Sequence, residues 1–307
     1  MSLVALVAAL LIEQWRPLAD RRYLYAQGER YARLLEAHFN AEEAQHGAIA
    51  WLLAVLPAVL ATWVAYVLAY RISPVLGLLF NVAALYVTMG FRQRSHYFTD
   101  IHLALKNDDL AEARRLLGAW LGVGCEDLDR EAVTRLTIEE ALTASHRYVF
   151  GVMFWFMLLP GPSGAILYRI ARFLNYRWNP QEAPQLERLG HFARDAFAVL
   201  DWLPARFTAT AFATMGNFED AVYCWRTQAS RWQDRTLGVI LASGAGAMAV
   251  RLGMPILQRG ELVDRPELGI GDAADIGHLD ATVGLVWRAL LLWLSLIFLL
   301  SVAAALS

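Results

Sequence analysis

Leu200-Asp-Trp-Leu-Pro-Ala-Arg206, followed by Phe-Thr-Ala, places an aspartate, a proline and an arginine within one short, otherwise apolar stretch. Charged groups at membrane depth are costly, so they usually lie in a protein interior or a wet cavity and pair with each other. Proline removes a helical hydrogen bond and opens carbonyl groups to a ligand or water. The spacing of Asp201 and Arg206 across Pro204 therefore predicts a functional site or a buried structural joint.

The composition points to a membrane protein. The 307 residues are 57% hydrophobic and 18% charged, with a mean hydropathy of +0.37, whereas soluble domains carry more charge and less apolar surface. The net charge of −2 gives no general attraction to nucleic acid. Cys125 and Cys224 lack metal-ligand spacing and are expected to be free thiols. The apolar start has no preceding basic residue and no cleavage site, so no cleavable signal peptide is expected.

Three apolar segments reach or approach the roughly 20 residues that a helix needs to cross a bilayer. They are residues 48–70, 74–89 and 283–306. The first two are joined by a short Arg-Ile-Ser-Pro turn and are expected to form a helical hairpin. Pro57 lies inside the first segment, and membrane helices tolerate proline.

Three further apolar runs are less regular. Residues 3–12 form either a helix completed by polar turns or an interfacial anchor. Residues 148–171 are interrupted by Pro160-Gly-Pro162, which predicts one kinked span or a re-entrant hairpin. Residues 237–254 carry small side chains at four-residue spacing, which permits close helix packing. The expected fold is all-α, with about four to six transmembrane helices.

The arginines predict the orientation. Those before residue 48 and those in residues 91–147 are separated by two spans, so the positive-inside rule places both groups in the cytoplasm. Residues 172–235 are also rich in arginine, and a re-entrant or twice-passing element at Pro160-Gly-Pro162 keeps them on the same side. The chain is thus expected to be one integral membrane domain, residues 1–307, with cytoplasmic helical segments at 91–147 and 172–235.

Two polar clusters predict helix starts in these segments. Asn107-Asp-Asp109 offers capping side chains for a helix through Trp120, and Asn217 precedes a second amphipathic run. No convincing strand pattern is found anywhere.

Few groups with catalytic or binding chemistry stand out. The histidines are dispersed, and no Walker loop, zinc spacing or nucleophile elbow is present. Arg92-Gln-Arg-Ser-His-Tyr97 predicts either a phosphate site or a basic anchor to anionic lipid. Glu139 and Glu140 either hold magnesium through carboxylate oxygens or form a solvated helix face in which Arg135 is paired. Arg169 either binds an anion at a helix end or extends from a membrane boundary.

The order of several segments resembles the CobD/CbiB family of cobalamin biosynthesis. The matching segments are Tyr168-Arg169 after a glycine-containing break, Leu-Asp-Trp-Leu-Pro-Ala-Arg-Phe-Thr-Ala from 200, Ala-Val-Arg-Leu-Gly253, Arg265-Pro-Glu-Leu-Gly269 and a final span. Ala111-Glu-Ala-Arg-Arg-Leu-Leu and the Leu-Asp-Arg-Glu run at 128–131 match as well. The resemblance covers most of the chain.

The resemblance implies an inner-membrane protein that attaches aminopropanol, or its phosphate, to adenosylcobyric acid by an amide bond, with ATP and Mg²⁺. It implies substrate or phosphate contacts by a set of residues carried over position by position, with Glu139 as the metal ligand. The substrate or phosphate candidates are Tyr168, Arg169, Asp201, Arg206, Arg251 and Arg265, and Pro204, Gly253 and Gly269 match beside them. The implied partners are the lipid bilayer, a corrinoid substrate and other copies or membrane proteins.

Several positions depart from the family pattern. Leu142-Thr-Ala144 stands where the family usually has Ala-Glu-Asn, Arg172-Phe-Leu-Asn175 replaces Asn-Thr-x-Asp, and Asp234-Arg-Thr236 replaces Ser-Pro-Asn. Leu241 aligns with an acid, and the N-terminal His-Pro element is missing. The chain is also similar to AmpE, a membrane protein implicated in β-lactamase signalling, in Glu-Gln-Trp-Arg, His146-Arg-Tyr and Leu-Asp-Trp-x-Pro. The alternative is therefore a non-catalytic, AmpE-like signalling or assembly protein.

Overall fold

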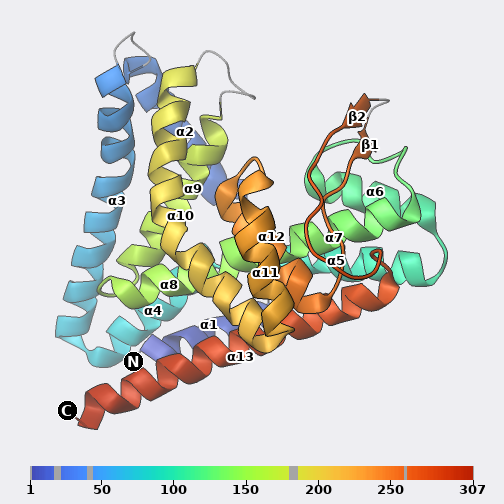
Figure 1. Ribbon diagram of the computed structural model, residues 1–307. Coiled ribbons are helices and arrows are strands. Elements are labelled where there is room, and N and C mark those ends of the chain that lie inside the picture. Colours follow the sequence, from blue (N-terminus) through green and yellow to red (C-terminus); the bar gives the residue numbers. More distant parts are fainter. Residues whose placement is uncertain (1, 17–21, 40–43, 180–185, 259–260, 307) are drawn as a thin grey trace. The chain divides into compact units, whose positions relative to one another are not determined.

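The chain is built almost wholly of α-helices (Figure 1). A computed structural model describes residues 2–16, 22–39, 44–179, 186–258 and 261–306. The expected all-α fold is confirmed. The chain divides into two compact units, Met1–Gly90 with Gly151–Pro204 and Phe91–Phe150 with Ala205–Ser307. Each unit is described separately below.

The first unit is organised around the long helix α3. Neighbouring helices α2, α4 and α9 pack on it, and α4 also contacts α1 and α9. The elements of this unit are α1 (Ser2–Trp15), α2 (Arg22–Phe39), α3 (Ala44–Ile72), α4 (Pro74–Thr88), α8 (Gly151–Leu158), α9 (Ser163–Arg177) and the first part of α10 (Glu187–Met215).

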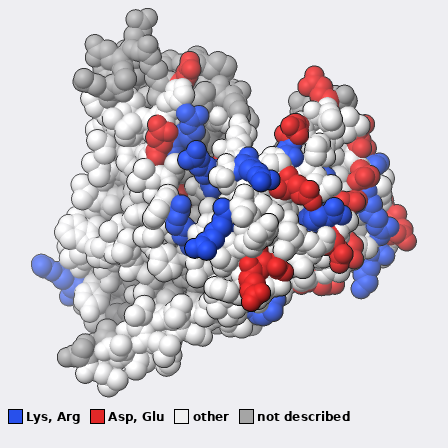
Figure 2. Space-filling model, in the orientation of Figure 1, with Lys and Arg blue, Asp and Glu red and all other residues white. Residues whose placement is uncertain are grey.

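Helix α3 is long and apolar enough to cross a membrane. Its stretch Gly47–Ile72 has a mean hydropathy of 2.2, and only 11% of its window is buried within the protein. Pro57 lies inside it, as expected. The surface over α3 carries almost no charge along most of its length (Figure 2). The predicted span is confirmed as a helix whose apolar side chains face outward.

The helix after α3 begins where the sequence predicts. The Ser73 hydroxyl accepts a hydrogen bond from the backbone N–H of Val75, and Pro74 occupies the first helical turn, where its missing N–H costs nothing. Helices α1 and α4 are apolar but shorter than a full span. The break at Pro160-Gly-Pro162 is also present, because α8 ends at Leu158 and α9 begins at Ser163.

The second unit contains the polar helices, the last long helix and a small sheet. Its elements are α5 (Phe91–Lys106), α6 (Leu110–Leu121), α7 (Arg130–Ser145), the π-helix η1 (His146–Phe150), the end of α10, α11 (Phe218–Gln228), the 3₁₀ helix η3 (Ala229–Arg231), α12 (Arg235–Met248), β1 (Ile256–Gln258), β2 (Glu261–Val263) and α13 (Ile276–Leu306). Charged side chains gather over α5, α6 and α7 (Figure 2).

The predicted helix starts are confirmed. The Asp109 carboxylate accepts from the N–H of Glu112 at the start of α6, and the Asn217 side chain accepts from the N–H of Asp220 at the start of α11. Both thiols are free and buried, as expected.

Helix α13 is the second segment long enough to cross a membrane. Its stretch Ile276–Ala303 has a mean hydropathy of 2.2, and 33% of its window is buried, because one face contacts α5, α7 and α12. The helix starts earlier than residue 283, since the Asp275 carboxylate accepts a 3.0 Å hydrogen bond from the N–H of His278. A local cap therefore extends the helix into polar sequence.

The expectation of no β-structure is wrong for one segment. β1 and β2 form an antiparallel hairpin, and two isolated bridges join Val250 to Asp272 and Leu252 to Leu268. These pairings are too short to show the alternation that marks a strand in a sequence. The two bridges also lie beside Gly253, Gly269 and Gly271, whose φ angles are positive.

The helix continues through Pro204, where the sequence predicts carbonyl groups open to a ligand or water. Helix α10 is continuous from Glu187 to Met215 with Pro204 inside it. Proline lacks the N–H that would bond the carbonyl four residues earlier, which is that of Leu200. The indole Nε1 of Trp155 donates to that oxygen at 3.2 Å. The indole N–H of Trp155 thus replaces the hydrogen bond that Pro204 cannot donate to Leu200.

Candidate functional site

The first unit contains one buried polar pair among the predicted residues. The Tyr168 hydroxyl on α9 donates a 2.8 Å hydrogen bond to Oδ1 of Asp201 on α10. Tyr168 is 0% exposed and Asp201 2%, and the ring of Phe197 packs at 5.6 Å from that of Tyr168. A Cβ on Gly151 would lie 2.4 Å from the Tyr168 ring. Asp201 is therefore an internal residue held by a close-packed tyrosine.

The second unit brings together predicted residues that are far apart in the sequence. Glu139 lies on α7, and its Oε1 accepts a 2.8 Å hydrogen bond from the N–H of Gly253. Its Oε2 accepts from the guanidinium of Arg265. Only 9% of the Glu139 side chain and 14% of the Arg265 side chain are exposed. A buried ion pair and a backbone hydrogen bond therefore hold Arg265 and Gly253 against α7.

Two glycines shape the backbone beside this ion pair. Gly253 has φ of +73°, and a Cβ there would lie 2.0 Å from the carbonyl oxygen of Pro266. Gly269 has φ of +88°, and its Cβ would lie 2.1 Å from the carbonyl oxygen of Val250. Only glycine meets both the conformation and the contact. Gln228 holds the same turn, since its amide bonds both the N–H and the carbonyl of Gly269.

The electrostatics of Glu139 follow from its position. Burial raises the pKa of the Glu139 carboxyl, while Arg265 and the N–H of Gly253 act in the opposite direction. The guanidinium of Arg265 also lies 5.0 Å from the ring centre of Trp232, a cation–π distance. The prediction that Glu139 lies on a solvated helix face is therefore wrong. The turn of α7 that carries Glu139 is covered by the residues around Gly253 and Arg265.

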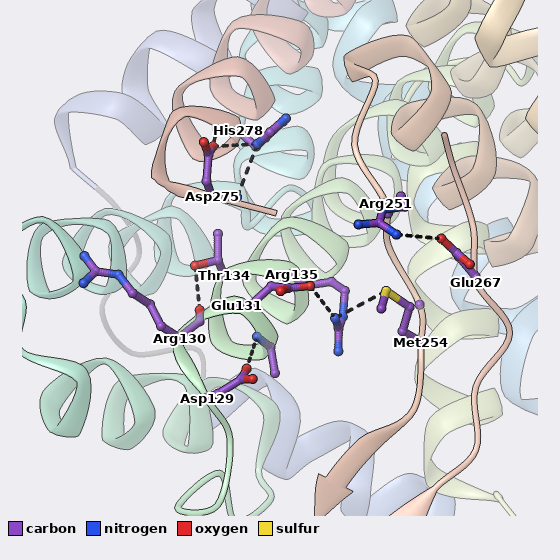
Figure 3. A network of polar contacts seen from close by, with 12 residues as sticks. Asp129, Arg130, Glu131, Thr134, Arg135, Arg251, Met254, Glu267, Asp275 and His278 are labelled. Carbon is purple, nitrogen blue, oxygen red and sulfur yellow. Dashed lines mark hydrogen bonds and ion pairs between the residues drawn. The ribbon is translucent and has the colours of Figure 1, made fainter. Parts of the chain in front are cut away.

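Two further arginines belong to this region (Figure 3). Arg135 lies one turn before Glu139 on α7, and its NH1 contacts Glu131 at 3.3 Å and the Met254 sulfur at 3.6 Å. Arg251 reaches Glu267 with a nitrogen–oxygen distance of 3.7 Å.

The remaining candidates are distributed between the units. Arg169 follows Tyr168 on α9 in the first unit, and Arg206 lies on the part of α10 that belongs to the second. Arg94 of the 92–97 segment donates to the Tyr148 hydroxyl at 3.1 Å and lies over its ring. That contact ties the segment to η1, where His146 Nδ1 is also hydrogen-bonded to Thr208 Oγ1 at 2.9 Å.

Glu139 does not fit a magnesium ligand as it stands. Both of its oxygens accept hydrogen bonds from protein donors, one of them a guanidinium. Within the described ranges, no group of three His, Cys, Asp or Glu side chains is arranged to hold a metal ion. The carboxylate in this arrangement serves as the partner of Arg265.

Two of the positions that depart from the family pattern are packed in the core. Leu142 on α7 is 0% exposed and Leu241 on α12 is 2% exposed. A Cβ on Gly244 would meet Leu142 Cδ1 at 2.7 Å. Leu142 takes the place of the alanine of the pattern, whereas Leu241 and Thr143, which is 5% exposed, stand where the pattern has acids.

Comparison with known sequences identifies the family. The family model described as CobD/Cbib protein matches residues 5–286, which include Glu139, most of both units and the residues Arg251 and Arg265. This chain belongs to the CobD/CbiB family. No solved structure matches it.

Several relatives align over most of their length. A protein of Stutzerimonas stutzeri named cobalamin biosynthesis protein CobD is 35% identical, over 95% of this chain and 95% of its own. One of the same name from Chromobacterium violaceum is 36% identical, over 84% of this chain and 80% of its own. The cobalamin biosynthesis protein CbiB of Salmonella typhimurium is 26% identical, over 82% and 80%.

Sequence reasoning missed three residues of this region as site components. Arg135 was considered only as a partner of Glu139, and neither Trp232 nor Gln228 was singled out. One signal was available for Arg135, because residues four apart share a helix face. No local signal marks Trp232 or Gln228, whose contacts with Arg265 and Gly269 join distant parts of the chain.

Proposed function

We propose that this chain is a multi-pass inner-membrane protein of cobalamin biosynthesis, acting where aminopropanol or its phosphate is attached to adenosylcobyric acid by an amide bond. The observation that carries the proposal is family membership over residues 5–286. Relatives named for cobalamin biosynthesis at 35% and 36% identity support the pathway. The apolar helices α3 and α13 support the membrane location.

The chemistry of the step suits the second unit. Amide formation joins an amine nitrogen to a carboxyl carbon and must remove one carboxyl oxygen. ATP with Mg²⁺ would supply phosphoryl transfer to that oxygen, which then leaves as phosphate. The residues of this chain would contribute positive charge to bind and orient the phosphate oxygens, and arginine forks do this well. Arg251 and Arg265 lie on a loop held in place by Glu139 and two glycines.

The Tyr168–Asp201 pair has a separate part in the proposal. Both side chains are buried and bonded to each other, and Arg169 follows Tyr168 directly on the helix. We assign this pair to holding α9 against α10, so that Arg169 is presented in a fixed position to the corrinoid substrate. Direct contact with substrate is assigned to the arginines.

Genetic complementation tests the function. In a strain with no second copy, deletion of the gene should stop conversion of adenosylcobyric acid, and the wild-type gene should restore it. R265Q should fail to restore conversion, whereas R115Q should succeed, because Arg115 is exposed and is paired with Glu112 on α6. Conversion that continues in the deletion strain would contradict the proposal.

A non-catalytic role is the second candidate, and one observation favours it. Thr143 and Leu241 are buried at positions where the family pattern has acids. An AmpE-like signalling or assembly protein would need the fold but not those acids. Nucleotide-dependent amide formation by the purified protein would exclude this candidate, and complementation by a variant without that activity would support it.

A further inference from the structure

One face of the first part of α10 carries exposed apolar side chains. Val199 is 76% exposed, Trp202 52% and Leu203 41%. Trp202 and Leu203 follow Val199 by three and four residues, so the three share one side of the helix. We call them the α10 apolar stripe. Contiguous apolar surface of this kind marks contact with another protein or with a membrane.

The character of this helix face changes within one turn. His191 and Asp195 precede Val199 on the same side of α10, and their side chains are 51% and 78% exposed. The face is therefore polar up to Asp195 and apolar from Val199 onward. Tryptophan is enriched where a membrane meets water, and Trp202 lies just after this change. A continuous helix shows such a pattern where it passes from water into a bilayer.

The polar groups within the same stretch of helix are turned inward and satisfied. Asp201 is 2% exposed and accepts a 2.8 Å hydrogen bond from the Tyr168 hydroxyl. The carbonyl of Leu200, which Pro204 leaves without its helical donor, accepts from the indole of Trp155 at 3.2 Å. In water both groups could be hydrated, whereas in hydrocarbon each needs a donor from the protein.

The long apolar helix α3 deals with its own proline in the same way. Pro57 leaves the carbonyl of Leu53 without its helical donor. The hydroxyl of Tyr31 on α2 donates to that oxygen at 2.9 Å. Helix α3 is long and apolar enough to cross a membrane. In both helices, therefore, a ring from a neighbouring helix supplies the missing donor, as membrane helices with proline require.

The stripe also lies at the level of the apolar stretch of α3. The rings of Trp51 on α3 and Phe192 on α10 are in contact, with centroids 6.0 Å apart. The two helices run in the same direction within this unit (Figure 1). Val199 is seven residues beyond Phe192, which is about 10 Å along a helix. The same distance beyond Trp51 reaches Ala58, well inside the stretch Gly47–Ile72.

We infer that the α10 apolar stripe faces the hydrocarbon of the bilayer, and that α10 enters the membrane between Asp195 and Val199. Hydropathy does not identify α10 as a span, because it counts Asp201 although that carboxylate faces the protein. The stripe covers about one turn, so α10 dips into one leaflet and the ends of residues 172–235 keep their predicted cytoplasmic position. The inference rests on the membrane location in the proposed function and is independent of the reaction.

Fluorescence quenching in vesicles of phosphatidylethanolamine and phosphatidylglycerol tests the stripe. The full chain carries a nitrobenzoxadiazole probe on a single introduced cysteine, since both native thiols are buried. Lipid that is spin-labelled near the middle of its acyl chain should quench the probe at V199C, and aqueous iodide should not. The matched control D195C, one turn earlier on the same face, should show the reverse. Quenching of V199C by iodide and not by the lipid would overturn the inference.

Two further positions keep the outcome clear. L203C repeats the measurement within the stripe in case V199C folds poorly. Leu60 on α3 is 54% exposed and lies inside the apolar stretch, so L60C reports whether the chain is in the bilayer at all. If the lipid quenches L60C but neither stripe position, the membrane location stands and this inference fails. If it quenches none of the three, both fail. A stripe shielded from lipid and iodide alike is covered by protein, a second copy included, and the inference is wrong.

Discussion

The residue type and helix position of Glu139 do not determine its partners in the fold. Its carboxylate and its place on a polar helix suggest either a metal ligand or a solvent-facing ion pair. Its actual partner, Arg265, is 126 residues away in the sequence. Because that contact depends on the path of the chain after α12, no local pattern could reveal it, whereas the need for glycine at 253 was visible in the family resemblance.

The burial of Glu139 predicts a pH dependence of stability. Burial raises the pKa of this carboxyl above its ordinary value of 4.5. Between pH 4.5 and the raised value, the folded protein therefore holds a proton that the unfolded chain has released. The stabilising contribution is complete below pH 4.5 and is lost as the pH rises through the folded-state pKa.

Thermal unfolding as a function of pH, with E139Q as control, measures this effect. The stability of the wild type should fall relative to that of E139Q across this window, because glutamine does not titrate. A wild type that gains stability relative to E139Q with rising pH would show that Arg265 and Gly253 outweigh burial.

Helix α10 shows what a motif can and cannot predict at the scale of an element. Leu200 to Arg206 correctly marks the family, and Asp201 is buried as its charge in an apolar stretch suggested. The proline predicts an open carbonyl, but Trp155 supplies a donor to the carbonyl of Leu200. The compensating residue lies on another helix, so the motif alone is insufficient.

A double-mutant cycle tests this compensation. W155F leaves the Leu200 carbonyl without its donor and should destabilise the protein by about 1–3 kcal/mol. P204A restores a backbone N–H to the helix, so W155F should cost clearly less in that background. Urea or thermal unfolding of the four proteins gives the coupling energy. Equal costs in both backgrounds would show that the indole contact does not depend on the proline.

The small residues of α12 carry the second prediction at this scale. Their spacing predicted close helix packing, and a Cβ on Gly246 would lie 2.5 Å from the carbonyl oxygen of Asp220 on α11. G246A should therefore separate the two helices and cost about 1–3 kcal/mol. Gly284 on α13 is a matched control, because no atom of the described residues lies within 4 Å of its Cβ position. If G246A and G284A unfold at the same temperature, the packing role of Gly246 is wrong.

At the scale of the molecule, composition predicted the class of fold, while the division into two units was not visible. The chain passes from one unit to the other near Gly90, Phe150 and Pro204. Two of these points coincide with irregular helical structure, namely the end of η1 and the proline of α10. Hydropathy detects long apolar helices such as α3 and α13, but it does not detect boundaries that run through continuous helices.

The membrane topology remains a prediction, and it can be tested on the whole protein. If α3 and α4 form a transmembrane hairpin, the turn at Ile72 lies on the side opposite the arginine-rich segments. Asp127 and Arg231 are exposed residues in the two predicted cytoplasmic segments, and Ile72 is 76% exposed. Single cysteines at these three positions report the side on which each lies.

Labelling of intact cells with a membrane-impermeant maleimide should modify I72C, while D127C and R231C should react only after the cells are opened. The native thiols should give little background at neutral pH, because burial raises the pKa of Cys125 and raises that of Cys224 to about 11. If R231C instead reacts in intact cells while D127C does not, the Pro160-Gly-Pro162 region crosses the membrane once. The arginines of residues 172–235 would then be an exception to the positive-inside rule.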